Sequence, residues 1–208
     1  MRRLGDEGQA FPVYIAVVAG LLFLAFAYFA VGQAASTRNG AQTAADAAAL
    51  AAAQDARDQL REGWLEVILD PGQWDGFLGA ETYVHDSACE SAADFASRNA
   101  AGLTGCDPLS SADSGFRVTV LTTGGEMSSA RASAEAVIEP RCQFEEPDQE
   151  PTPDPPPSPP SPSPSGEPDE EEPGPILGLS CHGEPWEIDP EDPRLPSATE
   201  LFTVRLSE

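Results

Sequence analysis

The feature that most constrains this 208-residue chain is an uncharged apolar run from Phe11 to Val31, FPVYIAVVAGLLFLAFAYFAV. As an α-helix rising ~1.5 Å per residue, the run would be about 30 Å long, which matches the hydrocarbon core of a bilayer. A signal peptide has a shorter apolar stretch, of about 7–15 residues, and a core helix of this length would lack neighbours to cover it in so small a protein. We therefore predict a transmembrane helix over residues 11–32, with a cleaved signal peptide as the alternative.

The charges that flank this run predict its orientation. Arg2 and Arg3 precede the run within residues 1–10, whereas Arg38 is the nearest cation on the other side. Under the positive-inside rule, residues 1–10 are then a cytoplasmic stub. We expect a single pass through the cytoplasmic membrane, with the N-terminus inside and the C-terminal domain outside.

The charge balance restricts the partners. The net charge of -24 comes from 35 acidic and 11 basic residues, and every basic residue is Arg. Such an acidic chain is repelled by phosphate backbones and by anionic head groups, so we expect no nucleic acid partner and contact with the lipid bilayer through the apolar helix. The lack of Lys and the abundance of Ala, Gly, Pro and Arg are typical of a GC-rich genome, such as that of an actinobacterium.

An Ala-rich helical extension is predicted over residues 33–69, because Ala is the best helix former and no proline occurs until Pro71. Ala41, Ala45, Ala48 and Ala52 recur at three- and four-residue spacing and form a narrow face of methyl groups. Small faces let helices approach closely, so this face is a candidate surface for packing on a partner span or on a second copy. The alternative is that the alanines reflect only helix propensity and base composition.

The rest of the chain predicts an α+β domain over residues 70–144 and 176–208, with Trp74 and Phe77 packed onto it. Ser87-x-x-Glu90 has capping-box spacing and predicts a short helix that starts there and stops at Gly102. Cys106 is then expected in the loop that leaves this helix. Period-2 alternation predicts an antiparallel sheet with one covered face, from strands at 116–120, 130–138 and 202–206. The first two strands are expected to form a hairpin through Gly124-Gly125.

Residues 145–175 have almost no apolar side chain and are predicted to be a disordered Pro/Glu-rich insertion. Four cysteines fall on the side assigned to the outside, where an even number is typical of disulfides. Of the three possible connectivities we favour the one that joins sequence neighbours: Cys89 with Cys106, and Cys142 with Cys181. Zinc is the alternative, but no C-x-x-C or H-x-x-x-H spacing accompanies the thiols.

No catalytic chemistry is apparent in the sequence. It contains no G-x-S-x-G elbow, phosphate loop, dinucleotide fingerprint or zincin motif. His85-Asp86 and Cys181-His182 are the only suggestive pairs, and both are interpreted as structural. We predict no enzyme activity, no cofactor and no metal site.

The N-terminal residues resemble a known family. A short Arg-containing stub with DEGQA, one apolar span and then NGAQTAADAAALAAA is similar to the N-terminal module of the TadE/TadG-like proteins of Tad (tight adherence) pilus assembly. The strongest element is AADAAALAAA, Ala44 to Ala53. The resemblance covers about the first sixty residues, and the metal-site serines and aspartates of the von Willebrand A-type domain in larger TadG relatives are not found here.

The resemblance implies a non-enzymatic, single-pass component of a Tad-type pilus assembly or secretion apparatus. Its implied partners are other pilus-assembly or pseudopilin-like membrane proteins, including a second copy of itself. Pilin-like relatives cut by a prepilin peptidase have Glu at the fifth mature position, whereas here Val13 follows Gly8 at that spacing and Ala10 follows Gly5. This departure favours a pseudopilin-like or accessory role over a major subunit. A membrane-anchored binding module unrelated to pili is the alternative, and an enzyme with a site outside known motifs is the third hypothesis.

Overall fold

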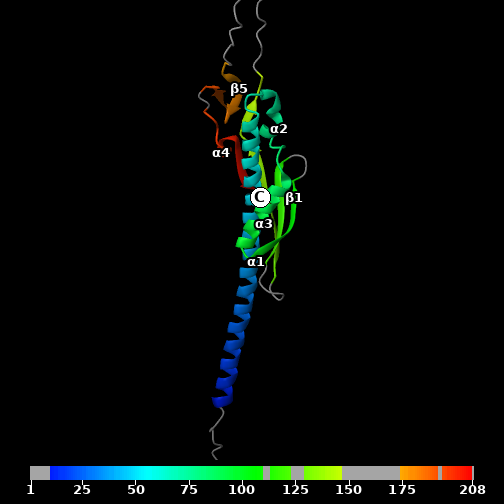
Figure 1. The fold of residues 1–208 in the computed structure, drawn as a ribbon. Coiled ribbons are helices and arrows are strands. Elements are labelled where there is room, and N and C mark those ends of the chain that lie inside the picture. The colour runs from blue at the N-terminus through cyan, green and yellow to red at the C-terminus, as the bar shows by residue number, and fades with distance from the viewer. Residues whose placement is uncertain (1–9, 110–112, 123–128, 147–173, 192–193, 208) are drawn as a thin grey trace, which may run out of the picture.

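One long helix organises the molecule. The computed structural model describes residues 10–109, 113–122, 129–146, 174–191 and 194–207. Helix α1 (Ala10–Glu66) has 57 residues, so it is about 85 Å long. Figure 1 shows its first half standing clear of the other described elements and its second half running through the domain. The predicted α+β class, in which an apolar helix continues into an Ala-rich helix and a small antiparallel-sheet domain follows, is confirmed.

The connection from α1 to α3 is rich in aromatic side chains. It contains the 3₁₀ turn η1 (Pro71–Gln73) and helix α2 (Asp75–Leu78), and helix α3 (His85–Arg98) follows it. Trp74 is fully buried, and its ring meets those of Trp64 and Phe144 edge-on at centroid distances of 5.3 and 4.9 Å. Its indole N–H donates to the Val67 carbonyl at 3.0 Å, which pairs the polar atom of the buried ring. The connection is therefore fixed to the end of α1.

The larger sheet has four antiparallel strands in the order β1-β2-β3-β7. They are β1 (Ala101–Pro108), β2 (Ser114–Thr122), β3 (Arg131–Pro140) and β7 (Phe202–Leu206). Helices α1 and α3 cover one face, onto which β2 projects Phe116, Val118 and Val120, all completely buried. The expected hairpin of β2 and β3 is confirmed by their pairing, while the predicted Gly124-Gly125 turn lies outside the described residues.

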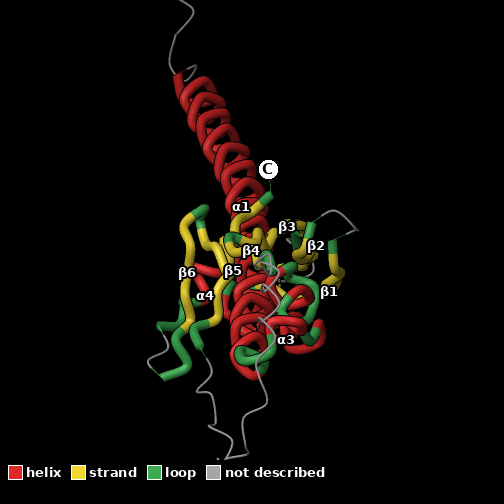
Figure 2. Tube along the Cα trace, turned by 90° about the horizontal axis from the view of Figure 1, so that it is seen from above, coloured by secondary structure: helices red, strands yellow, loops and turns green. Residues whose placement is uncertain are grey.

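A second sheet of three short antiparallel strands has the order β4-β5-β6. Its strands are β4 (Cys142–Phe144), β5 (Ile176–Cys181) and β6 (Glu184–Ile188), and helix α4 (Ala198–Leu201) leads from it to β7. His182 and Gly183 turn β5 into β6 with φ of 56° and 81°, as a two-residue hairpin turn requires. In Figure 2 the small sheet lies on one side of α1, whereas β1 and α3 lie on the other.

The predicted start of α3 is wrong. The helix begins at His85 after Val84, whose side chain makes no cap, and the Ser87 hydroxyl donates to an Asp55 carboxylate oxygen at 3.1 Å instead of capping. A complete capping box occurs elsewhere, between Ser197 and Glu200 at the start of α4. The capping pattern at Ser87 is misleading because residue 87 already lies in the first turn of the helix, where its hydroxyl donates to α1.

The predicted end of α3 is also wrong, and with it the setting of Cys106. The helix ends at Arg98, Ala100 takes the left-handed conformation with φ of 53°, and Gly102 is the second residue of strand β1. Cys106 therefore lies in a strand and not in a loop. Strand β1 lacks the alternation that reveals a strand in sequence, because it contains two glycines and a register shift near Thr104.

The predicted insertion at 145–175 has most of its length outside the described residues, at 147–173. The residues on either side of that stretch pair with one another as β4 and β5. The small sheet was not predicted, since its strands are three to six residues long and the alternation within each is too brief to detect.

Candidate functional site

The first candidate site is the bare half of α1. Large apolar side chains along it are exposed, including Phe11 at 71%, Leu22 at 65% and Tyr28 at 83%. None of the most apolar window of the helix is buried by the rest of the described chain, which excludes a core helix of the domain. A helix of this length and apolarity fits the hydrocarbon core of a bilayer. This half of α1 is the candidate anchor of a single-pass membrane protein.

The anchor and the domain are parts of the same helix. Between them, residues 32–40 form a polar stretch that is almost entirely exposed, and from Ala41 onward the domain covers α1. The hydroxyls of Thr37 and Thr43 donate to the carbonyls of Gln33 and Asn39, four residues earlier, so both are satisfied within the helix. A hydrogen-bonded helix, and not a loose linker, connects the two regions.

The four alanines proposed for helix packing lie inside the domain. Ala41, Ala45, Ala48 and Ala52 have no exposed surface. This part of α1 packs against α3, β2 and β3, and the buried face of α3 consists of Ala88, Ala92 and Ala96. The expectation that this face meets a partner span or a second copy is corrected, because the chain's own sheet and helix cover it.

A carboxylate on α1 fixes α3 in place. Asp55 accepts hydrogen bonds from the Ser87 and Ser91 hydroxyls, at 3.1 and 3.0 Å, and from the Gln59 amide at 2.5 Å. The Gln59 side chain in turn accepts from the Val84 backbone N–H at 2.8 Å, immediately before α3 begins. These bonds hold the first two turns of α3 against α1 and set the rotation of α3 about its axis.

The cysteines lie at disulfide distance in the two pairs that the sequence favours. Cys142 and Cys181 are directly opposite each other on β4 and β5, with a Cα separation of 4.0 Å, and are nearly completely buried. Cys89 and Cys106 join α3 to β1 across a Cα separation of 5.9 Å and are only half-buried. The first bridge lies within one sheet, whereas the second connects two layers of the domain.

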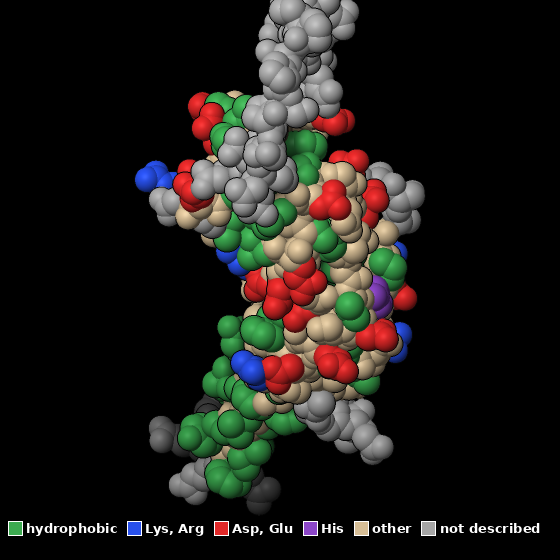
Figure 3. Space-filling view, turned by 45° about the horizontal axis from the view of Figure 1, so that its top comes forward, with side chains coloured by type: hydrophobic (Ala, Val, Ile, Leu, Met, Phe, Trp, Pro, Cys, Tyr) green, Lys and Arg blue, Asp and Glu red, His purple; other side chains and the backbone are tan. Residues whose placement is uncertain are grey.

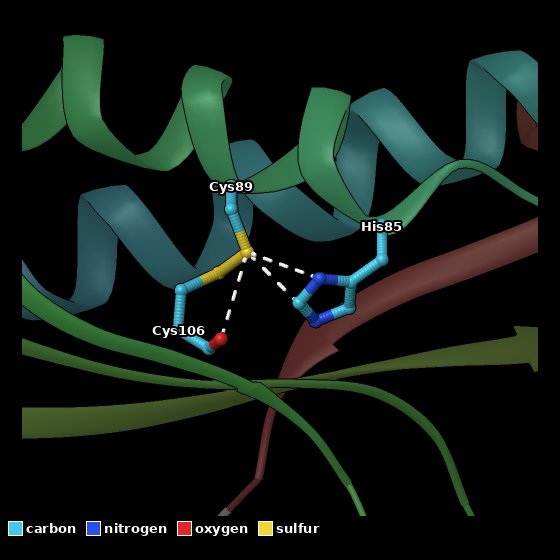
Figure 4. A group of neighbouring side chains, drawn as sticks. All are labelled: His85, Cys89 and Cys106. Carbon is cyan, nitrogen blue, oxygen red and sulfur yellow. Dashed lines mark hydrogen bonds between the residues drawn. A yellow bond between two sulfur atoms is a disulfide. The ribbon is translucent and has the colours of Figure 1, made fainter.

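His85 lies beside the second bridge. Figure 4 shows its imidazole next to the Cys89 sulfur, to which Nδ1 and Nε2 are 3.7 and 3.8 Å away. Among the residues that the structure describes, His85, Cys89 and Cys106 are the one group of three ligand-bearing side chains gathered closely enough for a metal ion. The other suggestive pair, Cys181-His182, has its cysteine in the buried bridge and its histidine in the exposed β5–β6 turn.

The signal for this cluster was present in the sequence. His85 and Cys89 are four residues apart, which places them on one face of a helix. A helix that starts at Ser87 leaves His85 in a loop, so the error in the start of α3 concealed the cluster. The position of Cys106 on β1 had no comparable sequence signal.

Few described groups have a shifted pKa. A hydrogen bond from Arg205 to Glu139 at 2.6 Å lowers the pKa of that carboxyl, and the capping-box bond from the Ser197 backbone N–H lowers the pKa of Glu200. Burial raises the pKa of Tyr83. Figure 3 shows carboxylates distributed over the domain, while apolar side chains dominate the protruding helix.

Comparison with known proteins supports the N-terminal resemblance. Residues 8–55 match the family model described as "Putative Flp pilus-assembly TadE/G-like", which confirms the predicted resemblance over these residues. The matched segment includes the whole bare half of α1 and the buried half as far as Asp55, so α3 and both sheets lie outside it. Neither a curated protein nor a solved structure matches the chain.

Proposed function

We propose that this protein is a non-enzymatic, single-pass membrane component of a Tad-type pilus assembly or related secretion apparatus, with a pseudopilin-like or accessory role. One observation carries the proposal. The family match at residues 8–55 covers a helix whose first part is bare and apolar and whose second part is the core of a domain.

The continuity of α1 supports an assembly role over a simple tether. A binding module needs only attachment to the membrane, for which a flexible linker is sufficient. A component that packs beside neighbouring subunits needs a fixed orientation relative to the membrane. Because α1 is both anchor and core, the domain cannot rotate independently of the span without breaking helical hydrogen bonds.

The proposed partners are the lipid bilayer, other pilus-assembly or pseudopilin-like membrane proteins, and a second copy of the chain. Since the domain covers the alanine face, contacts with these proteins would use the bare half of α1 or the outer surface of the domain. The non-enzymatic assignment rests on the matched family, whose description names pilus assembly, and on the lack of a catalytic motif in the sequence.

The proposed topology places residues 1–10 in the cytoplasm, 11–32 in the cytoplasmic membrane and 33–69 as the helix that enters the domain. The α+β domain of 70–144 and 176–208, with the 145–175 insertion, would lie outside. Two cysteine pairs at disulfide distance support an oxidising compartment. An alkaline-phosphatase fusion at Glu208 is then expected to be active, and activity of a cytoplasmic reporter there would overturn the orientation.

Exchange of the span tests the assembly role. In the organism that encodes the protein, residues 11–31 are replaced by an unrelated apolar helix of equal length, which keeps attachment and the helical connection. A pseudopilin-like or accessory component is expected to lose pilus assembly, measured by electron microscopy, while membrane fractionation shows normal retention. Unchanged pilus numbers in both this variant and a gene deletion would favour the unrelated binding module.

A further inference from the structure

We propose that His85, together with Cys89 and Cys106 in their dithiol form, is a binding site for a thiophilic divalent cation, with Zn²⁺ as the best fit. The Cys89–Cys106 disulfide is then the oxidised form of the site, in which neither sulfur is a thiolate ligand. This proposal does not depend on the pilus role, since it concerns only α3 and β1.

The distances suit the ion. Zn–S bonds of about 2.3 Å and Zn–N bonds of about 2.0–2.1 Å in a tetrahedron place sulfur about 3.8 Å from sulfur and about 3.5 Å from nitrogen. The Cys89 sulfur is already 3.7 Å from Nδ1 and 3.8 Å from Nε2 of His85, and all three ligand atoms lie within 4.8 Å of one another. The main change needed is separation of the two sulfurs by about 2 Å after the bond opens.

The ring needs only a rotation. Nearly equal distances from the Cys89 sulfur to the two ring nitrogens place both nitrogens within reach of an ion bound to that sulfur. A rotation about the bond between ring and side chain directs one lone pair at the ion. Asp86 Oδ1 lies 4.0 Å from Nδ1, so a carboxylate that could accept the N–H of the nitrogen not bound to the ion is close to the ring.

The surroundings favour a site that is supported on one side and open on the other. The Phe116 ring packs against the imidazole at a centroid distance of 5.4 Å and supports it from one side. The His85 side chain is 38% exposed and both sulfurs belong to half-buried residues, so water has access as the fourth ligand. Zinc sites with three protein ligands complete their tetrahedron in this way.

Of the two bridges, this one is the more accessible to reduction. Cys142 and Cys181 are 2% and 4% exposed and are held opposite each other by a sheet ladder. A reductant must reach a sulfur to form the mixed disulfide through which exchange proceeds. Access therefore directs reduction to the half-buried Cys89–Cys106 bond.

The chemistry balances with a dithiol as reductant. A protein or small-molecule dithiol gives two electrons and two protons to the Cys89–Cys106 bond, which becomes two thiols while the reductant becomes a disulfide. Binding of the cation by both sulfurs then releases their two protons to solvent, so affinity should rise with pH.

The test uses the full-length protein in detergent micelles with Co²⁺ as a spectroscopic probe and Zn²⁺ as competitor. After mild reduction, alkylation and peptide mapping are expected to find Cys89 and Cys106 modified and Cys142 and Cys181 still bridged. This form is expected to bind one Co²⁺ per chain with a thiolate charge-transfer band and tetrahedral d–d bands, which Zn²⁺ abolishes. The oxidised protein is expected to show neither band.

The two histidines provide matched variants. His85→Asn should weaken Co²⁺ binding more than about tenfold while both thiols still form, whereas His182→Asn should leave binding unchanged. Asn also tolerates the left-handed conformation at position 182. Circular dichroism verifies that both variants are folded. The proposal is overturned if the reduced protein binds no Co²⁺, if both variants bind equally, or if the Cys142–Cys181 bridge opens first.

Discussion

Both halves of α1 carry many apolar side chains, yet these side chains have opposite surroundings. From Phe11 to Val31 the helix carries bulky Phe, Leu, Tyr and Val side chains that no other described part of the chain covers. From Ala41 to Ala56 it carries mostly methyl groups, and those on the inner side are completely buried. The half suited to lipid is uncharged and bulky, whereas the half suited to a close-packed domain has small apolar side chains on its inner side and polar ones elsewhere.

The alanine half explains other features of the domain. A methyl group buries little surface, so each alanine contributes less to stability than a Leu or Phe would. Small faces allow α1 to approach α3 and the sheet closely at the same time, and the larger contributions come from a few residues such as Trp64, Phe116 and Phe202. Two disulfides add to a core of this kind by constraining the unfolded chain.

The largest expected effect comes from charges placed in the bare half. Leu21→Asp with Leu22→Asp should raise the free energy of membrane insertion by about 6 kcal/mol in total, since Asp at a span centre costs about 3 kcal/mol. The protein should move from the carbonate-resistant membrane fraction to the soluble fraction. Leu69→Asp is the control, because Leu69 is 70% exposed but follows α1. Full membrane retention of the double variant would show that this half is not the anchor.

The next largest effect is expected when Ala is replaced by Leu in each half of α1. Ala52→Leu adds three carbons to a side chain that is completely buried. Overpacking of this kind should lower the free energy of unfolding of the domain by about 1–3 kcal/mol. Ala27→Leu adds the same atoms to the bare half, where it should leave domain unfolding unchanged. Denaturant titration of both proteins in the same detergent measures the difference. Equal stabilities would mean that the alanine face is not tightly packed.

A smaller effect is expected at the glycines of α1. A side-chain carbon at Gly63 would overlap the Phe77 ring, whereas one at Gly40 would meet no atom within 4 Å. Gly40→Ala should therefore raise the free energy of unfolding by about 0.5–1 kcal/mol through helix propensity alone. Gly63→Ala should lose about 1 kcal/mol net, because displacement of the ring outweighs that gain. Thermal unfolding distinguishes the two, and stabilisation by both would indicate that Phe77 moves freely.

The sequence predicted the parts of the fold that repeat a pattern over many residues. The apolar run, the proline-free alanine segment and the alternating strands at Phe116, Ile138 and Phe202 each extend over enough positions for the period to be visible. Strand β1 and the small sheet had no such pattern, because glycines, a register shift and short length hide their alternation.

The candidate sites were predicted unequally for a related reason. The anchor follows from composition, which a sequence displays directly. The setting of the alanine face depends on what covers it, and the neighbours α3 and β3 are distant in sequence. The contact of His85 with Cys89 depends on a helix start that tertiary hydrogen bonds to Asp55 decide, and local capping rules contain no information on these.

The smallest effect is a pH dependence of the unfolding free energy, which should concern the domain and not the membrane anchor. Glu139 and Glu200 have pKa values lowered from an ordinary 4.5 by bonds to Arg205 and Ser197. A lowered folded-state pKa gives stability that is present above the unfolded-state value and is lost as pH falls through the folded-state value. Glu139→Gln with Glu200→Gln should therefore show a smaller loss of unfolding free energy than the parent protein below about pH 4.5.

The difference between parent and variant is the quantity to measure, because protonation also relieves repulsion among the many other carboxylates. Residues 11–31 contain no carboxylate, so membrane retention should stay constant over the same pH range. Denaturant titrations from pH 7 to pH 3, with membrane fractionation in parallel, test both statements. Identical acid profiles of parent and variant would show that these two pairs do not couple to folding, and loss of membrane retention at low pH would show that the two halves of α1 are not energetically separate.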